Sequence, residues 1–188
     1  MTHSARSSAV LAALVLGALS CGNPALDPRI EALGDEKPGV EEGEFHRPGQ
    51  PCLLCHGKYQ GVEPEMSVAG TIYGTPASET PVEDVRVTLV DAQGETRTVK
   101  SNCIGNFFIT REQWDPLFPL HAEIEYALPG APESTKRVVM STRINRDGSC
   151  AGCHVGTPNQ GSPGWVYCAA ADSGLEFPEP SSSCPGAR

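Results

Sequence analysis

The sequence predicts a mainly β protein, an antiparallel β-sandwich with low helix content. In residues 84–92 (DVRVTLVDA), Val85, Val87 and Leu89 alternate with polar side chains, the period-two pattern of a half-buried strand. Similar short segments recur along the middle of the chain, with Pro and Gly between them, as is typical of a sandwich. No stretch has convincing helical periodicity.

We expect six strands in this middle region. The Gly-containing turn at 92–94 predicts a hairpin between the second strand and the third. In the fifth strand, alternation places Ala122, Ile124 and Tyr126 on one face and His121, Glu123 and Glu125 on the other. In chain order the expected strands are 68–74, 84–92, 95–101, 106–110, 120–128 and 136–144.

Residues 67–111 contain GTIYG, then VEDVRVTLVDAQGETRTVKSNCIGNFFI. This pattern resembles the carboxypeptidase regulatory-like module, an Ig/prealbumin-like β-sandwich, and the resemblance extends plausibly to residue 145. It implies an auxiliary, non-catalytic domain that contributes fold and not function.

Two Cys-x-x-Cys-His pentapeptides flank this region, CLLCH at 52–56 and CAGCH at 150–154. The motif is the attachment signature of c-type haem: two thiols add to the haem vinyl groups, and the adjacent histidine becomes the proximal iron ligand. We therefore expect two covalent c-type haems, held by Cys52, Cys55, Cys150 and Cys153, with His56 and His154 as proximal ligands.

The position of the motifs suggests that the two haem sites lie together. If six strands run alternately up and down, the chain enters the first strand and leaves the sixth at the same end of the sandwich. A seventh strand before Cys150 would separate the motifs instead. The hypothesis is an electron-conducting pair of haems in a protein that carries electrons and is not a catalyst.

The second, distal ligand of each iron is a separate question. His46 lies just before the first motif and is the favoured distal ligand there. For the second haem, Met140 and His121 are both candidates, and Met140 is equally compatible with a place in the core. Met66 is expected to be ordinary packing. Histidine at both irons would give low potentials, whereas methionine raises the potential.

The N-terminus predicts export and a lipid anchor. Residues 1–20 combine Arg6 with the apolar run 9–19, which is too short to span a bilayer. Gly17 to Cys21 (GALSC) resembles a bacterial lipobox, which implies lipidation of Cys21. We expect a lipid-anchored protein of the bacterial cell envelope, and Gly22 favours the outer membrane over the inner one. The alternative is an ordinary cleaved signal peptide with an incidental cysteine.

Three cysteines lie outside the motifs and the lipobox. An exported chain favours one disulfide among them, with one buried free thiol left over, and the sequence does not choose the pair. They are Cys103, Cys168 and Cys184.

The remaining boundaries follow from composition. Residues 21–44 are rich in Pro, Gly and acids and predict a solvated tether. Residues 169–188 are expected to form a flexible tail unless Cys184 fixes them. Between them we expect a first haem-binding segment at 45–66, the sandwich at 67–145 and a second haem-binding segment at 146–168.

Charge and missing motifs narrow the function. Without residues 1–20, the chain keeps 13 of its 14 basic side chains against 23 acidic ones, a formal charge of −10. This charge argues against nucleic acid or anionic lipid headgroups as partners, and for a basic redox protein or no particular partner. One alternative is a peroxidase-like dihaem enzyme or gas sensor with one open haem site. A weaker one is a β-sandwich adhesion or binding lipoprotein with zinc or thiol sites.

Overall fold

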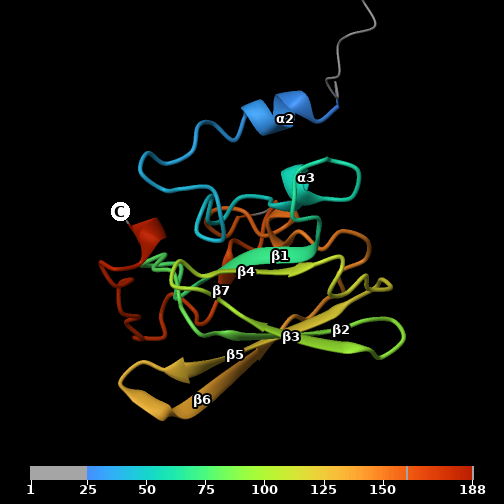
Figure 1. Cartoon of the computed structure of the whole chain (residues 1–188). Coiled ribbons are helices and arrows are strands. Elements are labelled where there is room, and N and C mark those ends of the chain that lie inside the picture. The colour runs from blue at the N-terminus through green and yellow to red at the C-terminus, as the bar shows by residue number, and fades with distance from the viewer. Residues whose placement is uncertain (1–24, 160, 188) are drawn as a thin grey trace, which may run out of the picture. The chain divides into compact units, whose positions relative to one another are not determined.

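The computed structural model describes residues 25–159 and 161–187 (Figure 1). The chain divides into two compact units, residues 1–34 and 35–188. Among its described residues, the first unit contains the helix α2 (Asp27–Glu31), which buries no side chain. No helix in the described part of the chain is both long and apolar enough to cross a membrane. The expected signal peptide and Cys21 lie outside the described residues.

The second unit is mainly β, and the predicted fold class is confirmed. Two sheets form two layers (Figure 1). In one sheet β1 (Met66–Tyr73) lies between β4 (Asn106–Thr110) and β7 (Val166–Tyr167). The other sheet has the order β3 (Thr96–Lys100), β2 (Arg86–Val90), β5 (His121–Leu128) and β6 (Ala131–Val139). The helical segments among the described residues of this second unit are α3 (Leu53–His56) and two short 3-10 turns, Cys150–Gly152 and Pro185–Ala187.

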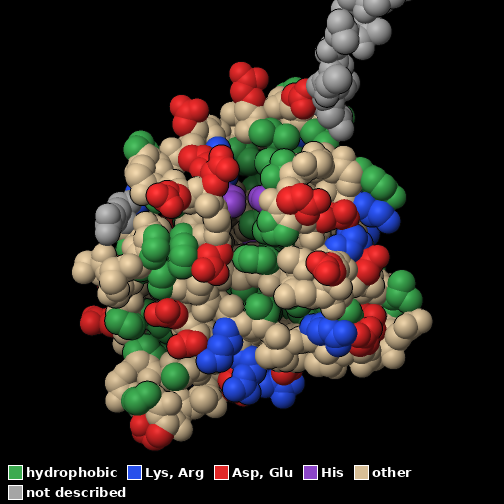
Figure 2. Space-filling model, viewed as in Figure 1, with side chains coloured by type: hydrophobic (Ala, Val, Ile, Leu, Met, Phe, Trp, Pro, Cys, Tyr) green, Lys and Arg blue, Asp and Glu red, His purple; other side chains and the backbone are tan. Residues whose placement is uncertain are grey.

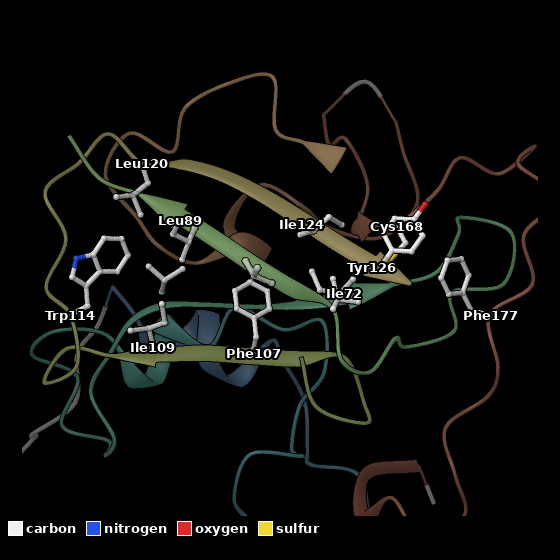
Figure 3. Close-up of a cluster of buried hydrophobic side chains, with 13 residues drawn as sticks. Ile72, Leu89, Phe107, Ile109, Trp114, Leu120, Ile124, Tyr126, Cys168 and Phe177 are labelled. Carbon is white, nitrogen blue, oxygen red and sulfur yellow. The ribbon is translucent and has the colours of Figure 1, made fainter. Parts of the chain in front are cut away.

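The core lies between the two layers (Figure 3). Ile72 and Phe107 come from the three-stranded sheet, and Leu89 and Ile124 come from the facing sheet. The expected alternation in β5 is present, because Ile124 and Tyr126 are buried while His121, Glu123 and Glu125 are not. Burial of these side chains supplies the main favourable free energy of folding.

Five of the six expected strands match β1 to β5 within a few residues, and β4 matches at both ends. The sixth is displaced: β6 covers Ala131–Val139 and not 136–144. Pairing explains the shift, because β6 follows β5 through a tight turn at Gly130 and its register places Val139 opposite Glu123. Val138 and Val139, which lie in both the expected and the observed strand, are exposed.

The sandwich does not end at residue 145. Ser149 forms a parallel bridge with Ala69, and β7 then pairs in parallel with Ile72 and Tyr73. The chain therefore pairs with β1 at Ser149, leaves the strand, and pairs with it again at Val166. The second Cys-x-x-Cys-His motif lies in this excursion, and the seventh strand therefore follows Cys150 and does not precede it.

The expected flexible tail needs correction. Phe177 is buried and packs against the ring of Tyr126, with 5.7 Å between ring centroids. Glu179 accepts a hydrogen bond from Thr80. A disulfide joins Cys184 to Cys103, 81 residues earlier. Residues 169–187 are thus fixed to the sandwich. The sequence predicts a flexible tail unless Cys184 forms a disulfide, and Cys184 does form one. Cys168 is the buried free thiol.

Candidate functional site

The first motif forms a single helical turn. Pro51 precedes α3, and the backbone N–H of Leu54 donates to the carbonyl of Pro51 at 2.8 Å. The N–H of His56 donates to the carbonyl of Cys52 at 2.9 Å, which closes the turn. Leu54 and His56 are buried, while Cys52 and Cys55 are half-buried. The turn therefore places Cys52, Cys55 and His56 within one turn of backbone.

A backbone carbonyl fixes the orientation of the His56 ring. Its Nδ1 lies 3.2 Å from the carbonyl oxygen of Pro64. A carbonyl can only accept, so this contact places the ring proton on Nδ1 and leaves the lone pair on Nε2. Ligating histidines in proteins commonly have such a partner on the ring nitrogen that does not bind the metal.

The second motif repeats this arrangement on a different local backbone. Cys150–Gly152 form a 3-10 turn, and the N–H of His154 donates to the carbonyl of Cys150 at 2.8 Å. Nδ1 of His154 lies 2.9 Å from the carbonyl oxygen of Gly164. His154 thus also keeps Nε2 free. Cys153 is exposed, and Cys150 packs against the core.

His46 lies beside the histidine of the first motif. The ring centroids of His46 and His56 are 5.8 Å apart. Nδ1 of His46 lies against the backbone of Gly43, whose N–H is 3.2 Å away and whose carbonyl oxygen is closer still. In either tautomer Gly43 engages Nδ1, so Nε2 is the nitrogen left for another partner.

Polar side chains of the sandwich hold the loop that carries His46. The amide of Asn106 donates to the carbonyl oxygens of Glu44 and His46, at 3.2 and 3.0 Å. Asn106 also accepts a hydrogen bond from Thr71 at 2.7 Å, and the same Thr71 oxygen accepts from the N–H of Gly49. Because Asn106 and Thr71 are buried strand residues, they position this loop rigidly over the sheet.

The two motifs lie against the same strand. A Cβ built at Gly70, in the middle of β1, would stand 2.8 Å from both Cβ and Sγ of Cys150. Burial, and after it the charge of the nearby Cys52, raises the pKa of the Cys150 thiol to about 12. Burial raises the pKa of Cys52 to about 11. The turns of both motifs contact β1, so the motifs are neighbours, although insertion beside β1 and not simple strand alternation brings them together.

A cavity of about 830 Å³ opens beside the second motif. That volume lies within the range of about 300–1,000 Å³ that is usual for small-molecule and cofactor sites. Its apolar wall includes inward-facing core residues of both sheets, among them Ile72 and Leu89. Cys150, Cys153 and His154 all line it. Figure 2 shows one hollowed face of the molecule, where histidine side chains lie among hydrophobic ones.

Polar atoms in the cavity wall lack partners within the described chain. Oγ of Ser149 and Nε1 of Trp165 are buried without a hydrogen bond. Arg143 and Arg146 also line the cavity, and neither forms an ion pair with a described residue. An apolar pocket with unpaired donors and guanidinium groups at its wall suits a flat apolar ligand with acidic substituents. Haem, with its two propionates, fits this description.

Sequence reasoning did not single out these four residues. In the sequence, a tryptophan, a serine and two arginines near a motif carry no pattern that indicates a binding site. Only the fold places the four side chains in the lining of one cavity.

The other candidates are placed as follows. Met140 lines the same cavity, and His121 does not appear in its lining. Met66 is buried in β1. Within the described residues, no group of three or more His, Cys, Asp or Glu side chains is close enough to hold a metal ion.

No protein-family model, curated protein or solved structure matches this chain.

Proposed function

We propose that the protein is a membrane-anchored dihaem cytochrome c that carries out outer-sphere electron transfer in the bacterial cell envelope. The observation that carries the proposal is the shared design of the motifs. In each, two thiols and an imidazole gather in one turn, and a backbone carbonyl holds Nδ1 so that Nε2 is free. When bound, c-type haem supplies one-electron iron chemistry.

The residues of the chain have distinct roles in this proposal. Cys52, Cys55, Cys150 and Cys153 hold the two groups covalently. Nε2 of His56 and of His154 would bind the irons, and Nε2 of His46 would be a second ligand for the first. The ring centroids of His46 and His56 are 5.8 Å apart, so both imidazoles are near enough to bind the same group.

The acidic surface and the predicted lipid anchor support an envelope protein that meets a soluble partner. A formal charge of −10 after loss of residues 1–20 favours encounter with a basic redox protein. We expect electron exchange with such a partner to slow as salt increases. Cys21→Ser would release the protein from the membrane fraction, and a protein that stays anchored would contradict lipidation at Cys21.

The direct test is the number of haems per polypeptide, measured by pyridine haemochrome on protein made with the c-type maturation machinery. We expect two haems that resist acid-acetone extraction. Cys52→Ala/Cys55→Ala and Cys150→Ala/Cys153→Ala should each leave one. Cys168→Ala, which removes a buried thiol outside the motifs, should leave two. No covalent haem in the unmodified protein would overturn the proposal.

The spin state separates an electron carrier from the peroxidase-like alternative. If both irons have two protein ligands, the resting spectrum is low-spin and carbon monoxide binds poorly. His46→Ala should create one high-spin site. A high-spin signal in the unmodified protein would instead favour an enzyme or gas sensor.

A further inference from the structure

The segment that follows β6 forms one wall of the cavity beside the second motif. β6 ends at Val139, and residues 140–147 line the cavity before the chain reaches Cys150. The N–H of Met140 donates to the carbonyl of Ala122 at 3.0 Å. This bond fixes Met140 beside the inward-facing residues of β5, in the same cavity as Cys150, Cys153 and His154.

Met140 is not needed as a core residue. Ile144, four residues further on, packs against the core cluster, whereas Met140 is neither in that cluster nor among the described side chains packed against it. Met140 is half-buried at the cavity wall. A thioether is a soft, weakly basic donor on an unbranched, adaptable side chain. Its position at the cavity wall is that of a side chain available to a ligand.

His121 lies on the opposite side of the sheet. β5 alternates, with Ile124 and Tyr126 buried and His121, Glu123 and Glu125 on the other face. Glu123 of that outer face still reaches the cavity lining, but His121 is not part of the lining. It pairs with Val90 of β2 and cannot turn inward without a one-residue slip of the whole strand. The topology thus separates His121 from His154.

We infer that Met140 would supply a second protein ligand, besides His154, to the haem that Cys150 and Cys153 would hold. This inference rests on the proposed function. It makes the two sites chemically different: the first has two imidazoles, His46 and His56, and the second has an imidazole and a thioether. Methionine ligation raises the reduction potential relative to paired histidines, so the second site, with haem bound, would have the higher potential of the two.

The test uses the purified holoprotein with both haems attached. Methionine-ligated ferric haem has a weak near-infrared charge-transfer band, and we expect the unmodified protein to show it. A redox titration should resolve two midpoint potentials. Met140→Leu should abolish the band and lower only the upper potential. Met140→His should also abolish the band but keep the site low-spin.

Two variants serve as controls. Met66→Leu changes the buried methionine of β1 and should keep the band, and His121→Asn should leave both the band and the potentials unchanged. Two attached haems without a methionine band, or loss of one low-spin signal in His121→Asn, would overturn the inference while the dihaem proposal stands. Absence of covalent haem would overturn the proposed function and this inference with it. The spectrum of the unmodified protein decides the matter even if Met140→Leu does not fold.

Discussion

The indole of Trp165 lies directly over Gly49. A Cβ built at Gly49 would stand 2.0 Å from Cζ3 of Trp165 and 2.7 Å from the hydroxyl of Tyr73. The rings of Tyr73 and Trp165 meet edge to face at 4.5 Å between centroids. The loop before the first motif, strand β1 and the loop after the second motif are therefore packed as one unit.

Gly49→Ala should separate these loops. Gly49 has a φ of +75°, where alanine costs about 1–2 kcal/mol, and the new methyl group would overlap two aromatic side chains, which adds about 1–3 kcal/mol. Gly61→Ala is the matched control, because Gly61 has a φ of +78° and nothing within 4 Å of its Cβ position. Urea unfolding of the holoprotein measures the difference. Equal losses in the two variants would show that Trp165 yields freely.

Asn106→Ala should loosen the loop that carries His46. The substitution removes the donors to the carbonyl oxygens of Glu44 and His46 and the acceptor for Thr71, at a cost of about 1–3 kcal/mol. We expect electron paramagnetic resonance to report a change at the first haem only. Thr98→Ala, which loses one exposed hydroxyl contact, is the control. An unaltered first-site signal in Asn106→Ala would mean that Asn106 does not position His46.

Loss of the Cys103–Cys184 disulfide should destabilise the folded unit by about 2–5 kcal/mol, because the bond closes a long loop. Cys184→Ser should also expose the segment around Phe177 to proteases. The double variant Cys103→Ser/Cys184→Ser should match the single variant in unfolding free energy. A double variant as stable as the unmodified protein would contradict a structural role for the bond.

Asp91 should make stability depend on pH in the acid range. Burial disfavours its charge, but hydrogen bonds from the backbone N–H groups of Leu117, Glu95 and Gln93 outweigh that effect and lower the pKa of its carboxyl. A lowered pKa in the folded state contributes stability above the ordinary pKa of aspartate and loses it as pH falls through the lowered value.

Asp91→Asn should therefore lower the melting temperature at pH 7, because an amide has one acceptor oxygen where the carboxylate has two. The difference from the unmodified protein should shrink as pH falls below about 4, the ordinary pKa of aspartate. Asp172→Asn, at an exposed position, is the control. A difference that grows on acidification would show that the sign of the effect is wrong.

Local pattern predicted much of the fold. The hairpin of β2 and β3 was predicted from the alternation of Val85, Val87 and Leu89 and from the turn near Gly94. A strand with one buried face has apolar residues at every second position, and this pattern is visible in the sequence. β6 was misplaced because its side chains are mostly exposed, and β7 was missed because only two residues pair. Neither strand has a burial pattern for the sequence to reveal.

The sequence by itself determined the chemistry of the candidate sites: two thiols and an adjacent imidazole, twice, with spacing that depends only on covalent connectivity. Tertiary structure decided what lies near what. The pairing of β1 with Ser149 and β7 brought the second motif beside the first and placed Trp165 on Gly49. The pairing of β5 placed Met140 beside Ala122 in the lining of the cavity and His121 opposite Val90, outside that lining. Such contacts join residues far apart in the chain, and the free energy that selects them comes from burying whole sheets.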